Sequence, residues 1–191
     1  ARVPGTVPRF ELRLRQLDSS ALAVLRNNVF VERLVNSPLD SLLAQDRLAS
    51  LEIADRGTKG LGGPTQNSTS RAKNAPNDYA DFILTVGAPP EDLQGGGSYG
   101  FGKTASYLAS RCSTIVVWSR SRNGEGEMVE RFIASAMGGV FDKDGQRYTG
   151  RQWWGAHPRG PQSQGLLAFE PIVGDEARRL QRRVLMALHH V

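Results

Sequence analysis

The sequence predicts an α/β fold. Apolar residues alternate with polar ones at 10–15 and 49–54, and residues 114–119 and 127–135 are two further strand candidates. Asn123 and Gly124 stand between the last two of these runs and predict a β-hairpin. Residues 175–190 repeat apolar side chains at helical spacing and predict an amphipathic helix. Strands joined by a short turn and covered by such a helix indicate a sheet with at least one helical layer.

The composition indicates one folded domain over residues 1–191. The chain has 191 residues, of which 39% are hydrophobic, so it can bury a core. Its apolar runs are too short to span a membrane, and its first residues do not resemble a signal peptide. The single cysteine, Cys112, fits a reducing compartment and is expected to be a small core residue. We therefore expect a cytoplasmic protein without a membrane partner.

The first part of the chain is predicted to run strand, helical insertion, strand. The strands are residues 10–15 and 49–54, and the insertion covers about 18–47. Within the insertion, Ser37 is expected to cap a helix that has Pro38 at its first position.

A first glycine box follows the second strand. Asp55 ends this strand, and Gly57 and Gly60 follow in a turn. A buried carboxylate at such a point can accept a hydrogen bond from the exocyclic amine of adenine. Glycine two residues later would leave room for the base to lie against the backbone.

A second glycine box begins at residue 95. Residues 62–96 are rich in glycine, proline and polar side chains, and they are expected to form a mobile lid with few apolar anchors. The box then opens a helix over residues 103–111, and a helix N-terminus with glycines around it favours phosphate. The candidate nucleotide-binding residues of this box are Gly97, Tyr99, Gly100, Phe101, Gly102, Lys103 and Thr104.

The same box also matches the phosphate-loop pattern G-x-x-x-x-G-K-[ST] when it is read from Gly97. A phosphate loop needs a buried strand that runs directly into its first glycine. The preceding apolar run, residues 82–86, can be capped by Asn77 or Asp78 and ended by Gly87, so it is better interpreted as a short helix. A phosphate-loop NTPase that uses residues 97–104 remains an alternative.

The two boxes, in this order and joined by a lid, resemble the GHKL ATPase superfamily. The resemblance covers about residues 48–120 and is nearest to the heat-shock-chaperone type. It implies the Bergerat fold, which is a two-layer α/β sandwich whose mixed, mostly antiparallel sheet carries helices on one face. It also implies ATP and Mg²⁺ as ligands, with slow hydrolysis coupled to a conformational change. The first box is one residue longer than usual in the family, and Lys103 is unusual at its place.

Members of the superfamily carry Glu-x-x-x-Asn on an early helix, where the Glu activates water and the Asn holds magnesium. Glu32 and Asn36 match this spacing. However, a new helix is expected to start at Ser37, and the family places its helix before the first strand pair. We therefore expect the true catalytic helix to lie upstream of Ala1 and the chain to be part of a longer protein. Glu32 and Asn36 are retained as weaker candidates for general base and metal ligand.

The sequence leaves the biological role open. Further domains or protein subunits are expected partners, because hydrolysis in this superfamily serves a larger machine. The net charge of +5 permits nucleic-acid binding without requiring it, and the arginines of the last helix are most simply its solvated face. A non-catalytic nucleotide-binding or scaffold module is the alternative function.

Residues 1–191 alone are expected to hydrolyse ATP at a negligible rate, because the positioned general base would be missing. Loss of such a base costs about 10²–10⁴-fold in rate. The measurement is magnesium-dependent phosphate release by the purified chain, with and without an N-terminal extension. Robust turnover that Glu32→Ala abolishes would contradict this expectation.

Overall fold

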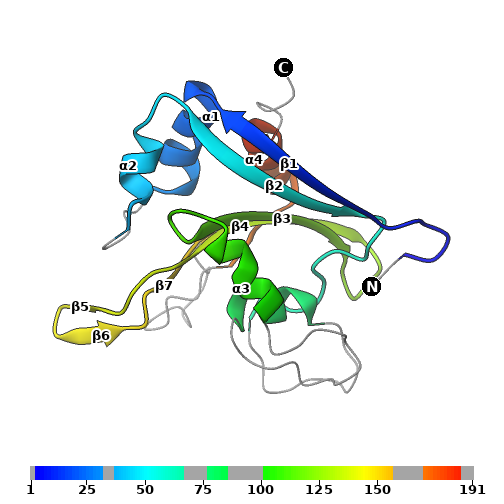
Figure 1. Cartoon of the computed structure of the whole chain (residues 1–191). Coiled ribbons are helices and arrows are strands. Elements are labelled where there is room, and N and C mark those ends of the chain that lie inside the picture. The colour runs from blue at the N-terminus through cyan, green and yellow to red at the C-terminus, as the bar shows by residue number, and fades with distance from the viewer. Residues whose placement is uncertain (1–2, 32–36, 67–76, 86–100, 157–169, 186–191) are drawn as a thin grey trace.

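A four-stranded antiparallel sheet lies at the centre of the molecule, with helices above and below it (Figure 1). The computed structural model describes residues 3–31, 37–66, 77–85, 101–156 and 170–185. Its strands are β1 (Arg9–Leu17), β2 (Leu48–Arg56), β3 (Thr114–Arg122), β4 (Met128–Met137), β5 (Phe141–Lys143), β6 (Gln146–Tyr148), β7 (Arg151–Trp154) and β8 (Ile172–Val173). Its helices are α1 (Ser19–Val24), η1 (Leu25–Val29), α2 (Leu39–Leu43), η2 (Ala80–Leu84), α3 (Phe101–Leu108) and α4 (Gly174–Leu185).

Strands β1 and β2 form a separate antiparallel ribbon, paired from Arg9 with Arg56 to Leu17 with Leu48. The helices α1, η1 and α2 lie between them in the chain, so the predicted order of strand, helical insertion and strand is confirmed. Asp18 begins the insertion, because its carboxylate accepts a hydrogen bond from the amide of Ala21 at 2.9 Å. The predicted helix start at Ser37 is displaced: α2 begins at Leu39, with Pro38 as its N-cap.

The central sheet has the strand order β3-β4-β7, and β8 also pairs with β4. The predicted hairpin between β3 and β4 is confirmed. The side-chain oxygen of Asn123 accepts hydrogen bonds from the amides of Glu125 and Glu127, at 3.0 and 2.8 Å, and so holds the turn. All strand pairs in the described residues are antiparallel.

Alternate residues of β4 enter two different cores. Phe132 packs in a large core with α1 and α4, whereas Ile133 packs in a smaller one with η2. The α/β class and the antiparallel pairing are therefore confirmed. The expectation of one mixed sheet with helices on a single face is not met in the described residues, because the helical insertion and α4 cover the face opposite η2 and α3.

Helix α4 has the predicted apolar stripe. Ala177, Leu180 and Val184 are buried against the sheet, and the arginines between them are exposed. The helix is described as far as Leu185, so the rest of the predicted stripe lies outside the described residues. None of the helices described is long and apolar enough to cross a membrane.

The β1–β2 ribbon carries its apolar side chains outward. Phe10, Leu12 and Leu14 project from the exposed face of β1, and Leu51 and Ile53 lie on the same face of β2. The other face is charged and half-buried; there Arg15 lies 2.6 Å from Glu52. Only where the ribbon meets α1 does the inward face become apolar, at Leu17 and Leu48.

Two leucines of β1 test this orientation. Leu17 is 4% exposed and Leu14 is 80% exposed, although they lie only three residues apart. Leu17→Ala is expected to lower the free energy of unfolding by about 2–5 kcal/mol, since it leaves a cavity in the core. Leu14→Ala is expected to change it by less than about 0.5 kcal/mol. Urea denaturation followed by circular dichroism measures both, and equal losses would contradict the described facing of the ribbon.

Candidate functional site

The first glycine box forms the turn that leaves β2. Asp55 is the second-last residue of the strand, and Gly57 and Gly60 both have left-handed backbone, with φ of +72° and +68°. The expectation that Asp55 is buried is wrong: its side chain is exposed, and its carboxylate accepts a hydrogen bond from the Thr58 hydroxyl at 2.8 Å. Asp55 shares the outward face of β2 with Leu51 and Ile53, because side chains alternate along a strand.

The end of this turn is fixed to β3. The amide of Leu61 donates to the Ser119 hydroxyl at 2.7 Å, and the carbonyl of Leu61 accepts from the Ser121 hydroxyl at 3.2 Å. The same carbonyl accepts from the guanidinium of Arg131 on β4 at 3.1 Å. A Cβ atom on Gly60 would lie 2.2 Å from the carbonyl oxygen of Arg120, so only glycine allows this approach.

The structure describes only the last residues of the second glycine box. Gly97, Tyr99 and Gly100 lie outside the described residues. The backbone of the next four candidates forms the first turn of α3, so the predicted helix begins earlier than residue 103 and ends at Leu108. Those four residues are Phe101, Gly102, Lys103 and Thr104.

Helix α3 is anchored on the sheet through Tyr107. This side chain is buried, and its hydroxyl donates to the Ser135 hydroxyl of β4 at 3.1 Å. Burial raises the pKa of Tyr107, so the phenol stays protonated at neutral pH and keeps this donor. Ser135 and Ile133 point to the same side of β4, so α3 and η2 lie on one face of the sheet.

Part of the expected lid is a packed helix. Residues 80–84 form η2, in agreement with the short helix predicted for the apolar run. The expectation of few apolar anchors is wrong for residues 77–85, because Tyr79 and Ile83 are fully buried. The amide of Tyr79 also donates to the carbonyl of Gly62 at 2.9 Å, which ties η2 to the first glycine turn. The remainder of residues 67–96 lies outside the described part of the chain.

Two arginines of the sheet hold η2 in place. The guanidinium of Arg131 lies 5.2 Å from the centroid of the Tyr79 ring. Arg151 donates to the carbonyls of Leu84 and Ile83, at 2.8 and 3.1 Å. These carbonyls lie at the end of the helix, where no further helical amide can donate to them. Burial lowers the pKa of both arginines, and burial also raises the pKa of Tyr79. At neutral pH these residues keep their ordinary charges, which suits a structural role.

The weaker catalytic candidates, Glu32 and Asn36, lie outside the described residues. In the part of the chain that is described, no group of three or more His, Cys, Asp or Glu side chains could hold a metal ion. The apolar run before the second box forms a helix at 80–84, as predicted, and the segment that leads into Gly97 lies outside the described residues.

Sequence reasoning missed the side chains that hold the first glycine turn. Ser119 and Ser121 are small hydroxyl residues on alternate positions of β3, and Arg131 lies on the neighbouring strand. These serines alternate with Trp118 and Arg120, so they share one face of β3, but the sequence does not indicate that this face meets Leu61.

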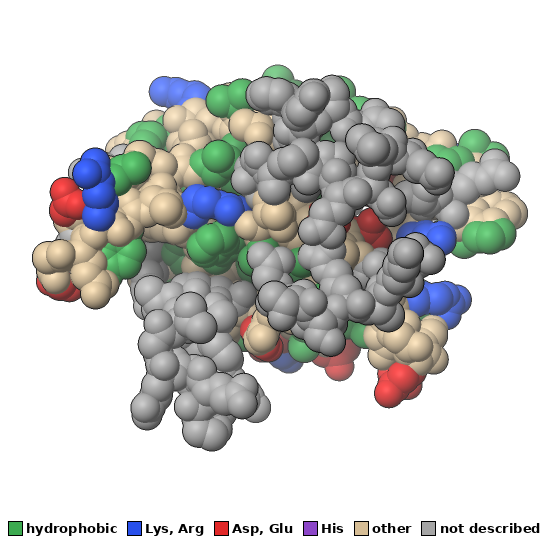
Figure 2. Space-filling view, turned by 90° about the horizontal axis from the view of Figure 1, so that it is seen from below, with side chains coloured by type: hydrophobic (Ala, Val, Ile, Leu, Met, Phe, Trp, Pro, Cys, Tyr) green, Lys and Arg blue, Asp and Glu red, His purple; other side chains and the backbone are tan. Residues whose placement is uncertain are grey.

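Seen from below, the molecule shows no continuous basic stripe among its described residues (Figure 2). The lysine and arginine side chains visible on this face stand apart from one another, with hydrophobic side chains between them (Figure 2). Comparisons of the chain with protein-family models, with curated proteins and with solved structures found no match.

Substitution of Gly60 tests the docking of the turn. Gly60→Ala is expected to lower the free energy of unfolding by about 1–3 kcal/mol, because alanine is strained at positive φ and its methyl group meets the Arg120 carbonyl. Gly124→Ala is the control, since a Cβ there meets nothing within 4 Å. Its effect is expected to stay within about 0.5 kcal/mol. Urea denaturation compares the two, and an unchanged stability of Gly60→Ala would rule out the close contact.

Proposed function

We propose that this chain binds ATP with Mg²⁺ through glycine boxes of the GHKL type, and that the intact protein hydrolyses ATP slowly to drive a conformational change. One observation carries the proposal. Asp55 ends a strand and is followed by two left-handed glycines in a turn that is clamped to the adjacent β3. The Asp55 carboxylate and the glycine backbone beside it are therefore held close to a fixed position. Recognition of a planar base requires groups that are fixed in this way.

The surroundings of Asp55 suit adenine. Leu51 and Ile53 lie on the same face of β2 and are about half exposed, so an apolar ring could cover them while its amine donates to the carboxylate. Asp55 is engaged only by the hydroxyl of Thr58 among the described residues, and this bond leaves acceptor capacity on its two oxygens.

The phosphates would lie at the second glycine box. Free amides at the start of α3 and its helix dipole favour anions, and Gly100 and Gly102 would let the backbone approach closely. Lys103 would add a positive charge. The hydrogen bond from Tyr107 to Ser135 holds α3 on the same face of the central sheet as η2.

The contacts described above support ATP binding more directly than they support ATP hydrolysis. Magnesium would bridge the phosphates and would need an oxygen ligand, such as an asparagine, and water would need a general base. Both would come from a Glu-x-x-x-Asn helix. Coupling of ATP binding to other domains or subunits would use η2, which adjoins the first glycine turn.

Asp55→Asn is expected to weaken binding of a non-hydrolysable ATP analogue by about 1–3 kcal/mol, the cost of losing a charged acceptor for the adenine amine. Calorimetry in the presence of Mg²⁺ measures the effect. Asp142→Asn is the matched control, because Asp142 is also exposed but lies in the β5–β6 hairpin. Equal affinity of wild type and Asp55→Asn would remove Asp55 from the site, and absence of any binding would overturn the proposed function.

A further inference from the structure

A pocket lies on the face of the central sheet that is turned away from α3 and η2. Its lining comes from β3, β4 and α4, and its volume is about 370 Å³. The lining residues are Trp118, Arg120, Glu130, Arg178, Gln181 and Arg182. We call it the arginine–tryptophan pocket. Its volume is at the lower end of the range for small-molecule sites.

Strand alternation places this pocket on the face of the central sheet opposite Leu61 and α3. Trp118 and Arg120 alternate along β3 with Ser119 and Ser121, whose hydroxyls face Leu61 on the other side of the sheet. Glu130 likewise alternates with Arg131, which also faces Leu61. A ligand in the pocket would therefore not share contacts with a nucleotide held by the glycine boxes.

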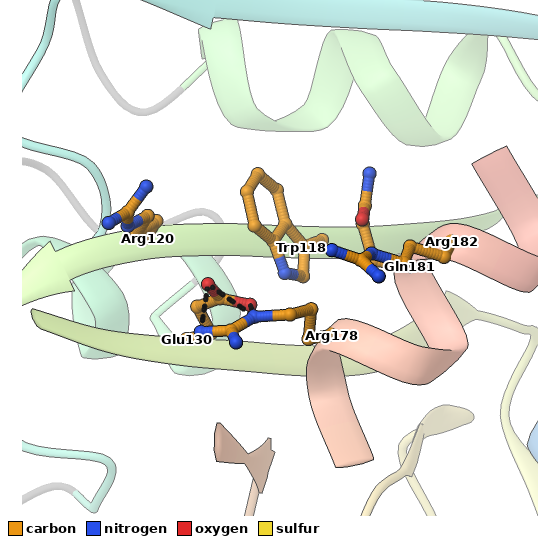
Figure 3. A pocket seen from close by; sticks show the side chains of 6 residues that line it. All are labelled: Trp118, Arg120, Glu130, Arg178, Gln181 and Arg182. Carbon is orange, nitrogen blue, oxygen red and sulfur yellow. Dashed lines mark hydrogen bonds and ion pairs between the residues drawn. The ribbon is translucent and has the colours of Figure 1, made fainter. Parts of the chain in front are cut away.

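The pocket offers hydrogen-bond donors that lack acceptors. The indole nitrogen of Trp118 is buried and has no hydrogen-bond partner in the described part of the chain. An indole N–H can only donate, so a buried one without an acceptor is unfavourable. Arg120 and Arg182 are exposed and form no ion pair with the residues described. In the view of Figure 3 the indole stands between these two arginines, and Gln181 lies beside Arg182.

The single acid of the lining is already neutralised. Glu130 is buried, and the Nε of Arg178 donates to both of its oxygens, at 3.1 and 3.2 Å (Figure 3). Asp175 also lies 3.4 Å from Arg178. The hydrogen bond with Glu130 raises the pKa of Arg178 and keeps the pair charged. Three guanidinium groups and one carboxylate leave the lining with a net charge of +2, carried by Arg120 and Arg182.

We propose that the arginine–tryptophan pocket is a binding site for the phosphate group of a small organic phosphate. The two guanidinium groups of Arg120 and Arg182 supply charged donors, and guanidinium geometry matches phosphate oxygens in pairs. Gln181 adds a neutral donor and acceptor that can contact the rest of the ligand. The ion pair between Glu130 and Arg178 holds α4 on β4, so the helix that carries Arg182 is fixed before the ligand arrives.

Nuclear magnetic resonance tests the site directly. The chain has three tryptophans, so its indole N–H signals are few, and the signal of Trp118 is assigned by its loss in Trp118→Phe. Pyrophosphate is the probe, titrated at constant ionic strength, with sodium chloride as the reference. We expect the Trp118 signal to shift and saturate. Arg182→Gln and Arg120→Gln are each expected to raise the Kd at least about tenfold, since each removes a charged donor.

Arg183→Gln is the matched control. Arg183 is exposed on the same helix but does not line the pocket, so this variant is expected to change the Kd less than twofold. Arg182→Gln and Arg183→Gln both alter exposed side chains of α4. The spread of the amide signals in the same spectra shows whether each variant is folded. A Trp118 signal that pyrophosphate does not move would overturn the proposal. If Arg182→Gln and Arg183→Gln weakened pyrophosphate binding equally, the proposal would be overturned, because the result would indicate a general basic surface. The same conclusion would follow if the Trp118 signal shifted only when an oligonucleotide was added.

Discussion

The close approach of Gly60 to β3 is the contact on which the candidate nucleotide site depends. One end of the β1–β2 ribbon packs into the large core through Leu17 and Leu48, so the turn after β2 sets the position of the other end relative to the central sheet. Leu61 sets it, because its amide and carbonyl bond two serines of β3. These bonds form only if the preceding backbone comes within van der Waals distance of Arg120. Glycine is the one residue that permits this, through both its missing Cβ and its positive φ.

This contact also connects the first glycine turn to η2. The carbonyl of Leu61 accepts from Arg131, and Arg131 in turn lies over the ring of Tyr79. The amide of Tyr79 then donates to Gly62. The result is a closed set of contacts between the turn, the central sheet and η2. A ligand that displaced one of these elements would disturb the others, so the proposed nucleotide binding would be coupled to η2 through these contacts.

The central sheet separates two regions of different chemistry. One face of β4 carries Ile133 and Ser135 toward η2 and α3, beside the glycine turn. The other face carries Phe132 into the large core and Glu130 into the ion pair with Arg178. The proposed phosphate pocket lies on β3, β4 and α4, whereas the proposed nucleotide residues lie on β2, the turn after it and α3, which are hydrogen-bonded to the other face of β3 and β4. Coupling between them would have to pass through the strands themselves, because alternating residues of one strand move together.

The sequence by itself determined four of the strands and several helices, because hydrophobic periodicity and turn chemistry are local properties, but it did not predict β5 to β8. The strands on each side of the insertion, the hairpin at Asn123 and the apolar stripe of α4 were all predictable from it. The turn that Gly57 and Gly60 form after β2 was also predictable, although the exposure of Asp55 was not. Only the tertiary structure decided that helices cover both faces of the sheet and that Ser119 meets Leu61. It also brought Arg182 to the same pocket as Trp118. These facts depend on contacts between residues far apart in the chain, and local pattern carries no information about which distant partner a polar side chain will find.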